Sequence, residues 1–586
     1  MHLGFAVYFN KKTSISKSCV DIHLRLGFLL INGEVHYVKL RQQPNEHYSC
    51  IILEDEQIPK FRGFSTDDDN EVKIITKNAI QGPVDAKHEN DSSKIIEIFA
   101  RKKTIAEAQV ELLCKSKKHV PDLKIANGIL APEVVKIVDG GDQANRIDVV
   151  FMGDGYQESE RGKFFEDIER LTKEMFEGTT FRSYLPLFNI WAIYEASVDS
   201  GIGYHSGLKN TPFQLYRDAG TLRGIYPGNA GHARTVCRLT GTSGCDYPSI
   251  IGNDDFYGGL GGEFVISTRS NRTGTVVLRH EMGHNFVDVG EEYDQGEVYC
   301  GVNSARSVET LGWTHWLSGE AREERAIYCI LAYPWADLAK GPQTINFTSD
   351  GSYCRWYLLA SVSAAGEHDC LEFLLDGEVL PWTTHGFDDR EFYDWYGNEG
   401  FTQGPHTFSV RSKTNSTNPN IPRMICHVQL HEFGSETDFH MSNDYISAYP
   451  TFHVDGAKTF RPTNAGCVMR NMSRGSFCPV CREGMWYRFL ERISLIDSVV
   501  ISLGTSPRNV TLNTLKLGAL RAPGNEVGGE CLEVRWSRDG QEQINLRDRF
   551  MIRAESGSWT VSVKLITPEI RSDPKGLTID TYSFTI

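Results

Sequence analysis

The pattern of hydrophobic and polar positions predicts several β-rich segments around one α/β core. Residues 1–128 alternate hydrophobic and polar positions in short stretches separated by turn-forming residues, which is typical of strands. Residues 146–152 are mostly apolar, a composition that is typical of buried strands. Apolar positions across 159–176 recur at helical spacing, and the runs 187–194 and 263–268 again indicate strands. This strand, helix, strand order favours a sheet with helices packed on it.

Two sequence echoes indicate a pair of related β modules in the second half of the chain. Residues 370–377 are echoed by residues 531–540, because both stretches begin with Cys-Leu-Glu and end with Asp-Gly. Residues 404–410 are similarly echoed by residues 557–563. Short alternating strands with regular turn signals are typical of Ig-like or jelly-roll β-sandwiches, so we predict two such modules.

A helical pattern at Met485–Leu495 shows that α/β character resumes after the first module. We therefore interpret that module as an insertion that splits one α/β domain. The predicted fold class is α+β multidomain, an α/β domain with β-sandwich accessory domains. The predicted domains are a β-rich domain at 1–128, the first part of the α/β domain at 129–321, an inserted β-sandwich at 322–440, the second part of the α/β domain at 441–497 and an Ig-like β-sandwich at 498–586.

Composition and charge narrow the class of protein. Hydrophobic residues make up 40% of the 586 positions and charged residues 23%, as in globular proteins. The formal net charge of -15 argues against a nucleic-acid partner, which requires a basic face to neutralise phosphates. We also expect no membrane span, because no run approaches the ~18 apolar residues that a bilayer requires. Oligomeric state has no signature in the sequence.

Cysteines and glycosylation sequons bear on the location of the protein. Cys237 and Cys245, and Cys467 with Cys478 or Cys481, have separations typical of disulfides. Six Asn-X-Ser/Thr sequons add to this picture, so an extracellular, secreted glycoprotein is our first expectation. The N-terminus lacks a basic segment followed by an apolar run of about 7–15 residues, the pattern of a signal peptide. A cytoplasmic location is therefore the alternative.

The segment from Thr275 to Phe286 contains the motif H-E-x-x-H. Residues four apart lie on one face of a helix, so His280 and His284 can offer their imidazoles to one Zn²⁺. Glu281 would lie beside the open coordination position, where it can act as general base on a zinc-activated water. Two helical histidines that merely pack are the competing interpretation.

A catalytic zinc site needs a third protein ligand, and an acidic cluster follows the helix. Glu291 would lie about 10 Å beyond His284 if the helix continued, so we expect Gly290 to end the helix and turn the chain back. Glu291 is then the first carboxylate that can reach the metal, with Glu292 as the alternative. Asp288 and Asp294 are better placed to bond the imidazole N–H groups.

The block Arg279–Asp294 resembles the zinc metallopeptidases named after immunoglobulin-A peptidase, which show H-E-x-G-H-x-F and then an acidic pair with Tyr. Residues 148–156 and 257–262 agree with that family, and residues 461–488 agree more loosely. The family often has Asp-Glu-Tyr where this chain has Glu291-Glu292-Tyr293. The resemblance implies a zincin-like α/β catalytic domain, one zinc per chain and a protein or glycoprotein substrate.

Other residues near these motifs are candidates for supporting roles. Met469 resembles the family's methionine segment below the metal, with an ordinary core methionine as the alternative. Tyr293 is a candidate oxyanion donor or a packed tyrosine. The predicted edge strand for an extended substrate contains Gly262, Glu263, Phe264 and Val265.

The motif Cys478-Pro479-Val480-Cys481 permits two interpretations. Together with Cys467 and Cys300 it can form a structural zinc site, and in a secreted protein it favours disulfides instead.

We therefore expect a zinc-dependent endopeptidase that hydrolyses peptide bonds of extracellular proteins. One alternative is a non-catalytic adhesion or carbohydrate-binding protein built on a vestigial peptidase core. Another is a zinc amidase or deacetylase.

Overall fold

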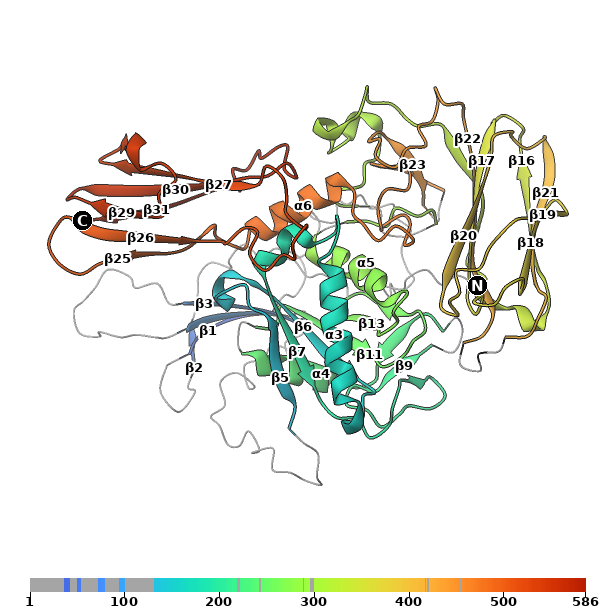
Figure 1. Cartoon of the computed structure of the whole chain (residues 1–586), viewed down its shortest axis with the longest axis horizontal. Coiled ribbons are helices and arrows are strands. Elements are labelled where there is room, and N and C mark those ends of the chain that lie inside the picture. Colours follow the sequence, from blue (N-terminus) through green and yellow to red (C-terminus); the bar gives the residue numbers. More distant parts are fainter. Residues whose placement is uncertain are drawn as a thin grey trace. The chain divides into compact units, whose positions relative to one another are not determined.

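The computed structural model (Figure 1) divides into two compact units, Met1–Ile129 and Leu130–Ile586. It describes four strands of the first unit and residues 131–586, apart from 219–221, 242–243, 288, 296–299, 417, 419–420 and 454–455. The first unit contains an antiparallel sheet of order β2-β1-β4-β3. Its strands are β1 (His36–Gln42), β2 (Cys50–Leu53), β3 (Val72–Asn78) and β4 (Lys94–Ala100).

The second unit is built around a six-stranded sheet of order β12-β13-β11-β6-β7-β5. Strands β13, β11, β6 and β7 are parallel, and the two outer strands pair antiparallel. The strands are β5 (Glu133–Val138), β6 (Ile147–Asp154), β7 (Phe188–Tyr194), β11 (Tyr247–Gly252), β12 (Gly259–Leu260) and β13 (Val265–Thr268). Every residue of β6 is buried, as its mostly apolar sequence predicts for a central strand covered on both faces.

Helices cover both faces of this sheet. The helices are α3 (Arg161–Met175), α4 (Ala230–Cys237), α5 (Gly274–Phe286) and α6 (Pro479–Leu490). Successive side chains of a strand point to opposite faces, so Phe151 packs in the core that contains residues of α3, α5 and α6. Met152 packs in a second core with Ala233 and Val236 of α4. No helix among the described residues is both long and apolar enough to cross a bilayer.

Helix α6 begins and ends earlier than the predicted helix at Met485–Leu495. Pro479 occupies its first turn, where a missing N–H costs no hydrogen bond, and Cys478 is its N-cap. The hydrophobic pattern did not reveal this start because the first turn carries the cysteine motif.

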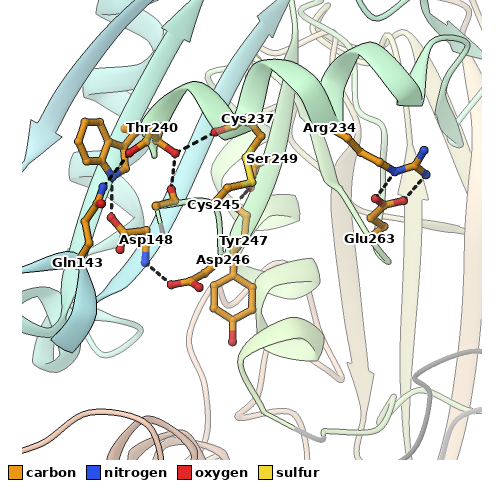
Figure 2. Close-up of a disulfide and its surroundings, with 12 residues drawn as sticks. Gln143, Asp148, Arg234, Cys237, Thr240, Cys245, Asp246, Tyr247, Ser249 and Glu263 are labelled. Carbon is orange, nitrogen blue, oxygen red and sulfur yellow. Dashed lines mark hydrogen bonds and ion pairs between the residues drawn. A yellow bond between two sulfur atoms is a disulfide. The ribbon is translucent and has the colours of Figure 1, made fainter. Parts of the chain in front are cut away.

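A disulfide joins the end of α4 to the segment before β11 (Figure 2). Its partners are Cys237 and Cys245, as their spacing predicts. The Thr240 hydroxyl lies 2.8 Å from the Cys237 carbonyl oxygen and closes the loop between them. The backbone N–H of Asp148 in β6 donates to the Asp246 carboxylate at 2.9 Å, so this loop also aligns β11 with β6.

Residues 326–433 form two sheets that enclose a separate core. Leu358 and Val362 of one sheet pack with Phe373 and Phe408 of the other. One sheet has the order β14-β22-β17-β20 with β15 beside β22, and the other has the order β16-β21-β18-β19. The strands are β14 (Ala326–Ala332), β15 (Ala336–Asp337), β16 (Gln343–Ser349), β17 (Arg355–Val362), β18 (Leu371–Leu375), β19 (Glu378–Leu380), β20 (Glu391–Gly397), β21 (Gly404–Ser412) and β22 (Met424–Phe433).

The C-terminal segment also forms two sheets, of order β25-β26-β29 and β28-β27-β30-β31. The strands are β25 (Ile496–Ile501), β26 (Arg508–Thr514), β27 (Cys531–Arg538), β28 (Gln541–Glu542), β29 (Met551–Ala554), β30 (Ser558–Ile566) and β31 (Ile579–Thr585). Shorter strands are β8 (Gly203–Tyr204), β9 (Leu215–Arg217) and β10 (Ile225–Pro227) in one sheet, and β23 (Tyr449–Phe452) and β24 (Lys458–Arg461) as a pair. The described part of the chain is thus a sheet-rich α+β structure with few helices.

The sequence echoes correspond to equivalent strand arrangements. Asp376-Gly377 joins β18 to β19, and Asp539-Gly540 joins β27 to β28. The φ angles of both pairs are positive, at 52° and 84° and at 50° and 79°, as a two-residue hairpin turn with the sheet's own twist requires. The second echoed stretch then pairs with the first in each module, β21 with β18 and β30 with β27.

The inserted strands also hold the beginning of helix α5. Asp389, just before β20, accepts hydrogen bonds from the backbone N–H of Tyr257 and the hydroxyl of Thr273, both at 2.6 Å. The Ser270 hydroxyl donates to the same carboxylate. Because Thr273 is the N-cap of α5, one buried carboxylate fixes the position of this helix.

We expect Asp389→Ala to lower the free energy of unfolding by about 1–3 kcal/mol, because it leaves buried donors without an acceptor. Urea denaturation of the full chain measures this change. Asp394→Ala removes an exposed carboxylate from β20 and serves as the control, with a change within about 0.5 kcal/mol. Equal stability of the two variants would contradict the assigned role of Asp389.

Candidate metal centre and active site

Helix α5 presents both histidines of the motif on one face. Its buried Leu278, Met282 and Phe286 pack in the core beneath the helix and hold it against the sheet. The rings of His280 and His284 lie with their centroids 5.1 Å apart and nearly perpendicular. The i, i+4 spacing therefore brings the two imidazoles together, as the motif predicts.

Backbone carbonyls orient the two imidazoles. Nδ1 of His280 lies 3.3 Å from the carbonyl oxygen of Val468, and Nδ1 of His284 lies 3.0 Å from that of Val289. A carbonyl oxygen only accepts, so each Nδ1 carries the proton that it donates. Each Nε2 is then directed away from its carbonyl and towards a common point, which is how metal-binding histidines are held.

Glu291 occupies the position opposite the two histidines. Its Oε1 lies 3.2 Å from Nε2 of His284, and its Oε2 lies 3.4 Å from Nε2 of His280. One ligand atom from each of the three residues lies within 4.8 Å of the others. Two imidazole nitrogens and one carboxylate are the donor set of many catalytic zinc sites, with a further position open. The residues present therefore fit a divalent cation.

The protonation of these groups supports the same conclusion. Burial would lower the pKa of His280, but the Glu291 carboxylate raises it to about 9. Burial would raise the pKa of Glu291, but the two histidines hold it well below its usual range. The Glu291 carboxylate therefore favours positive charge on the two imidazoles. A dication at the same point would place its positive charge beside the same carboxylate.

The chain reaches Glu291 by a different route from the one expected. Helix α5 ends at Phe286, and its C-cap, Val287, is extended with φ −147° and ψ 155°, so the helix ends before Gly290. Asn303 then holds the turn, because its Oδ1 accepts from Gly290 N at 2.8 Å and its Nδ2 donates to Gly290 O at 2.9 Å. Asn303 has no signal in the sequence, since its partner lies thirteen positions away in a loop.

The remaining acids of the cluster have other partners. Glu292 lies with three cysteines rather than with the histidines. Asp294 accepts from Arg470 Nη1 at 2.9 Å and lies 2.7 Å from His431 Nε2. The expectation that Asp294 bonds the imidazoles of His280 and His284 is therefore wrong, because backbone carbonyls occupy both Nδ1 positions. Asp288 lies outside the described residues.

Glu281 is buried directly beside this site, with 4% of its surface exposed. A Cβ added to Gly261 would collide with its Oε2, so the carboxylate lies against the backbone of the loop after β12. Burial raises the pKa of Glu281, which makes its carboxylate a stronger base. Tyr257 was not predicted as a site residue. Burial raises the pKa of its hydroxyl, and the negative charge of the nearby Glu281 raises it as well.

The predicted substrate strand is placed differently. Gly262, Glu263 and Phe264 precede strand β13, which begins at Val265. Strand β13 pairs with β11 on one side and with β12 on the other, so the outer strand of the sheet is β12. The apolar pattern reveals a strand but not its neighbours, and this is why the edge was misplaced.

Met469 and Tyr293 lie in different surroundings. Met469 is fully buried, and a Cβ added to Gly283 would lie 3.4 Å from its Sδ, so it packs beneath α5. Its carbonyl oxygen accepts from the N–H of Glu292 at 3.1 Å. Tyr293 is half-buried, and its ring centroid lies 6.3 Å from that of Tyr333.

Comparison with known proteins identifies the class of this core. Residues 135–309, which contain the three clustered residues and Glu281, match the model of a family of peptidases, which are hydrolases of peptide bonds. The particular family is IgA Peptidase M64, and its model matches residues 135–309. The resemblance seen in the sequence is therefore confirmed over this part of the chain.

No curated protein matches the chain. Among solved structures, a GH2 beta-galacturonidase from Eisenbergiella tayi matches with 10% identity and a TM-score of 0.12, over 42% of this chain and 35% of that one. The adhesin domain of Epf from Streptococcus pyogenes matches with 10% identity and a TM-score of 0.10, over 42% and 71%. A beta-glucosidase from Kluyveromyces marxianus matches with 8% identity and a TM-score of 0.13, over 44% and 46%. At these TM-scores the similarity carries no inference about this chain.

We expect Gly261→Ala to reduce kcat/KM for peptide hydrolysis by about 100-fold, because the new methyl group displaces the Glu281 carboxylate. The metal content should stay unchanged, because a Cβ at position 261 would contact Glu281 but none of His280, His284 and Glu291. Gly231→Ala in helix α4, where a Cβ meets nothing within 4 Å, is the control and should keep full activity. Full activity of Gly261→Ala would show that a methyl group at position 261 does not displace the Glu281 carboxylate.

Proposed function

We propose that the chain is a zinc-dependent endopeptidase that hydrolyses peptide bonds of extracellular proteins. The observation that carries this proposal is the convergence of His280, His284 and Glu291 beside Glu281, within residues that match a peptidase family. The Cys237–Cys245 disulfide supports an extracellular location, because such bonds persist in oxidising surroundings.

Different side chains would bind the zinc and transfer the proton during hydrolysis. His280, His284 and Glu291 would hold the zinc, with the two imidazoles oriented by the carbonyls of Val468 and Val289. When bound, zinc lowers the pKa of a water molecule and polarises the scissile carbonyl. Glu281 accepts the proton that the attacking water loses and then donates it to the leaving amine. Burial raises the pKa of Glu281, which makes its carboxylate a better proton acceptor.

The arrangement favours a catalytic role over a non-catalytic one. Glu281 is a buried carboxylate beside the candidate metal site. A non-catalytic adhesion or carbohydrate-binding protein would not require a base in this position. A zinc amidase or deacetylase would use the same groups, so substrate profiling distinguishes it from a peptidase. A peptide library cleaved at internal bonds is the expected result for an endopeptidase.

We expect Glu281→Gln to abolish cleavage of casein and immunoglobulin while the bound zinc is retained, because the variant keeps the ligands and loses the base. Activity should fall at least about 100-fold. Metal analysis and a gel-based cleavage assay on the same preparation test both points. Glu555→Gln, which changes an exposed acid paired with Arg538 in the C-terminal sheets, is the control. Stoichiometric zinc with unchanged cleavage in Glu281→Gln would overturn this mechanism.

We further expect a strong chelator to abolish cleavage and added Zn²⁺ to restore it, because no described side chain replaces the Lewis acid. Glu291→Ala should lose activity even with zinc added in excess, since it removes one of three ligands. Activity that survives chelation would contradict a metal-dependent mechanism.

A further inference from the structure

A second group of potential ligands lies beneath the candidate active site. It consists of Cys467, Cys478, Cys481 and Glu292, and ligand atoms of all four lie within 4.8 Å of one another. Each of these residues is at most 1% exposed. They come from three separate segments: the loop after α5, the segment that contains Met469, and the beginning of α6. Together these four residues are the thiol cluster.

The spacing of the sulfur atoms matches that of thiolates around a metal ion. Sγ of Cys481 lies 3.8 Å from Sγ of Cys467 and 3.6 Å from Sγ of Cys478. A tetrahedral zinc site with Zn–S bonds of about 2.3 Å separates its sulfurs by about 3.8 Å. A disulfide would bring two sulfurs to about 2.05 Å. It would also leave the third thiol and a carboxylate buried without a partner.

Glu292 supplies an independent indication of a ligand. Its Oε1 accepts from Asn303 Nδ2 at 2.9 Å, whereas its Oε2 is buried and has no hydrogen-bond partner. An unsatisfied carboxylate oxygen in the interior is costly unless a cation lies beside it. Three thiolates and one carboxylate complete a four-coordinate set.

A redox role for the C-x-x-C motif fits the structure less well. Catalytic cysteine pairs are partly exposed so that a partner's sulfur can reach them. Cys478 and Cys481 are buried, with Phe477 beside them packed against helix α5.

We propose that the thiol cluster binds a second Zn²⁺ with a structural role. This ion would join the loop that carries Glu291 to the segment whose Val468 carbonyl orients His280. Glu291 and Glu292 are consecutive, so one loop would contribute a ligand to each of two metal sites. The proposal does not depend on peptidase activity.

Metal analysis of the full chain, purified without chelators, tests the proposal. We expect two zinc ions per wild-type chain and one in Cys478→Ser and Cys481→Ser. Cys370→Ala removes a buried thiol outside the cluster and should keep two. Glu291→Ala should lose the other ion and keep the one in the thiol cluster.

Replacement of zinc by Co²⁺ in the wild-type protein provides a measurement that does not require a folded cysteine variant. Thiolate ligands give Co²⁺ an intense sulfur-to-metal charge-transfer absorption, whereas the two histidines and Glu291 give none. One zinc per wild-type chain, together with absence of this absorption, would overturn the proposal. An inactive protein that holds two zinc ions would instead refute the proposed peptidase and leave the second site established.

Discussion

The site depends on one buried electrostatic interaction, that of the Glu291 carboxylate with the Nε2 atoms of His280 and His284. A carboxylate this deeply buried must be compensated by positive charge, which protons on the histidines or a metal cation can provide. The surrounding structure meets this constraint from several directions. Helix α5 supplies the imidazoles, the Asn303 turn returns the carboxylate, and backbone carbonyls direct the rings.

These supports come from distant parts of the chain. The Val468 carbonyl, which orients His280, follows the strands of residues 326–433 in the chain. Asp389, within this segment, holds the N-cap of the helix that carries His280. The strands of residues 326–433 therefore lie between two segments of the site in sequence and also contact one of them. These strands therefore add a buried contact to α5 in addition to separating it from the segment of Val468 along the chain.

The parts of the site that could be predicted depend on local sequence, whereas the other parts depend on contacts between residues that are far apart in the chain. The pairing of His280 with His284 follows from helical periodicity, a local property of the chain. The end of α5 at Phe286 and the clamp by Asn303 depend on tertiary contacts that a hydrophobic pattern does not report. The partners of Asp294 were missed for the same reason, because Arg470 and His431 are far away in sequence. Strand β13 was predictable from its apolar residues, whereas its internal position in the sheet was not.

The adjacent residues Glu291 and Glu292 connect the two clusters. Consecutive side chains in non-helical chain can point to opposite sides, so one carboxylate meets the histidines and the next meets the cysteines. Asn303 donates to Glu292 and to the Gly290 carbonyl, and Met469 accepts from the Glu292 N–H. A shift of Glu292 would therefore move Glu291 as well. The position of Glu291 beside the histidines is thus held in part by the contacts of its neighbour, which does not face the histidines itself.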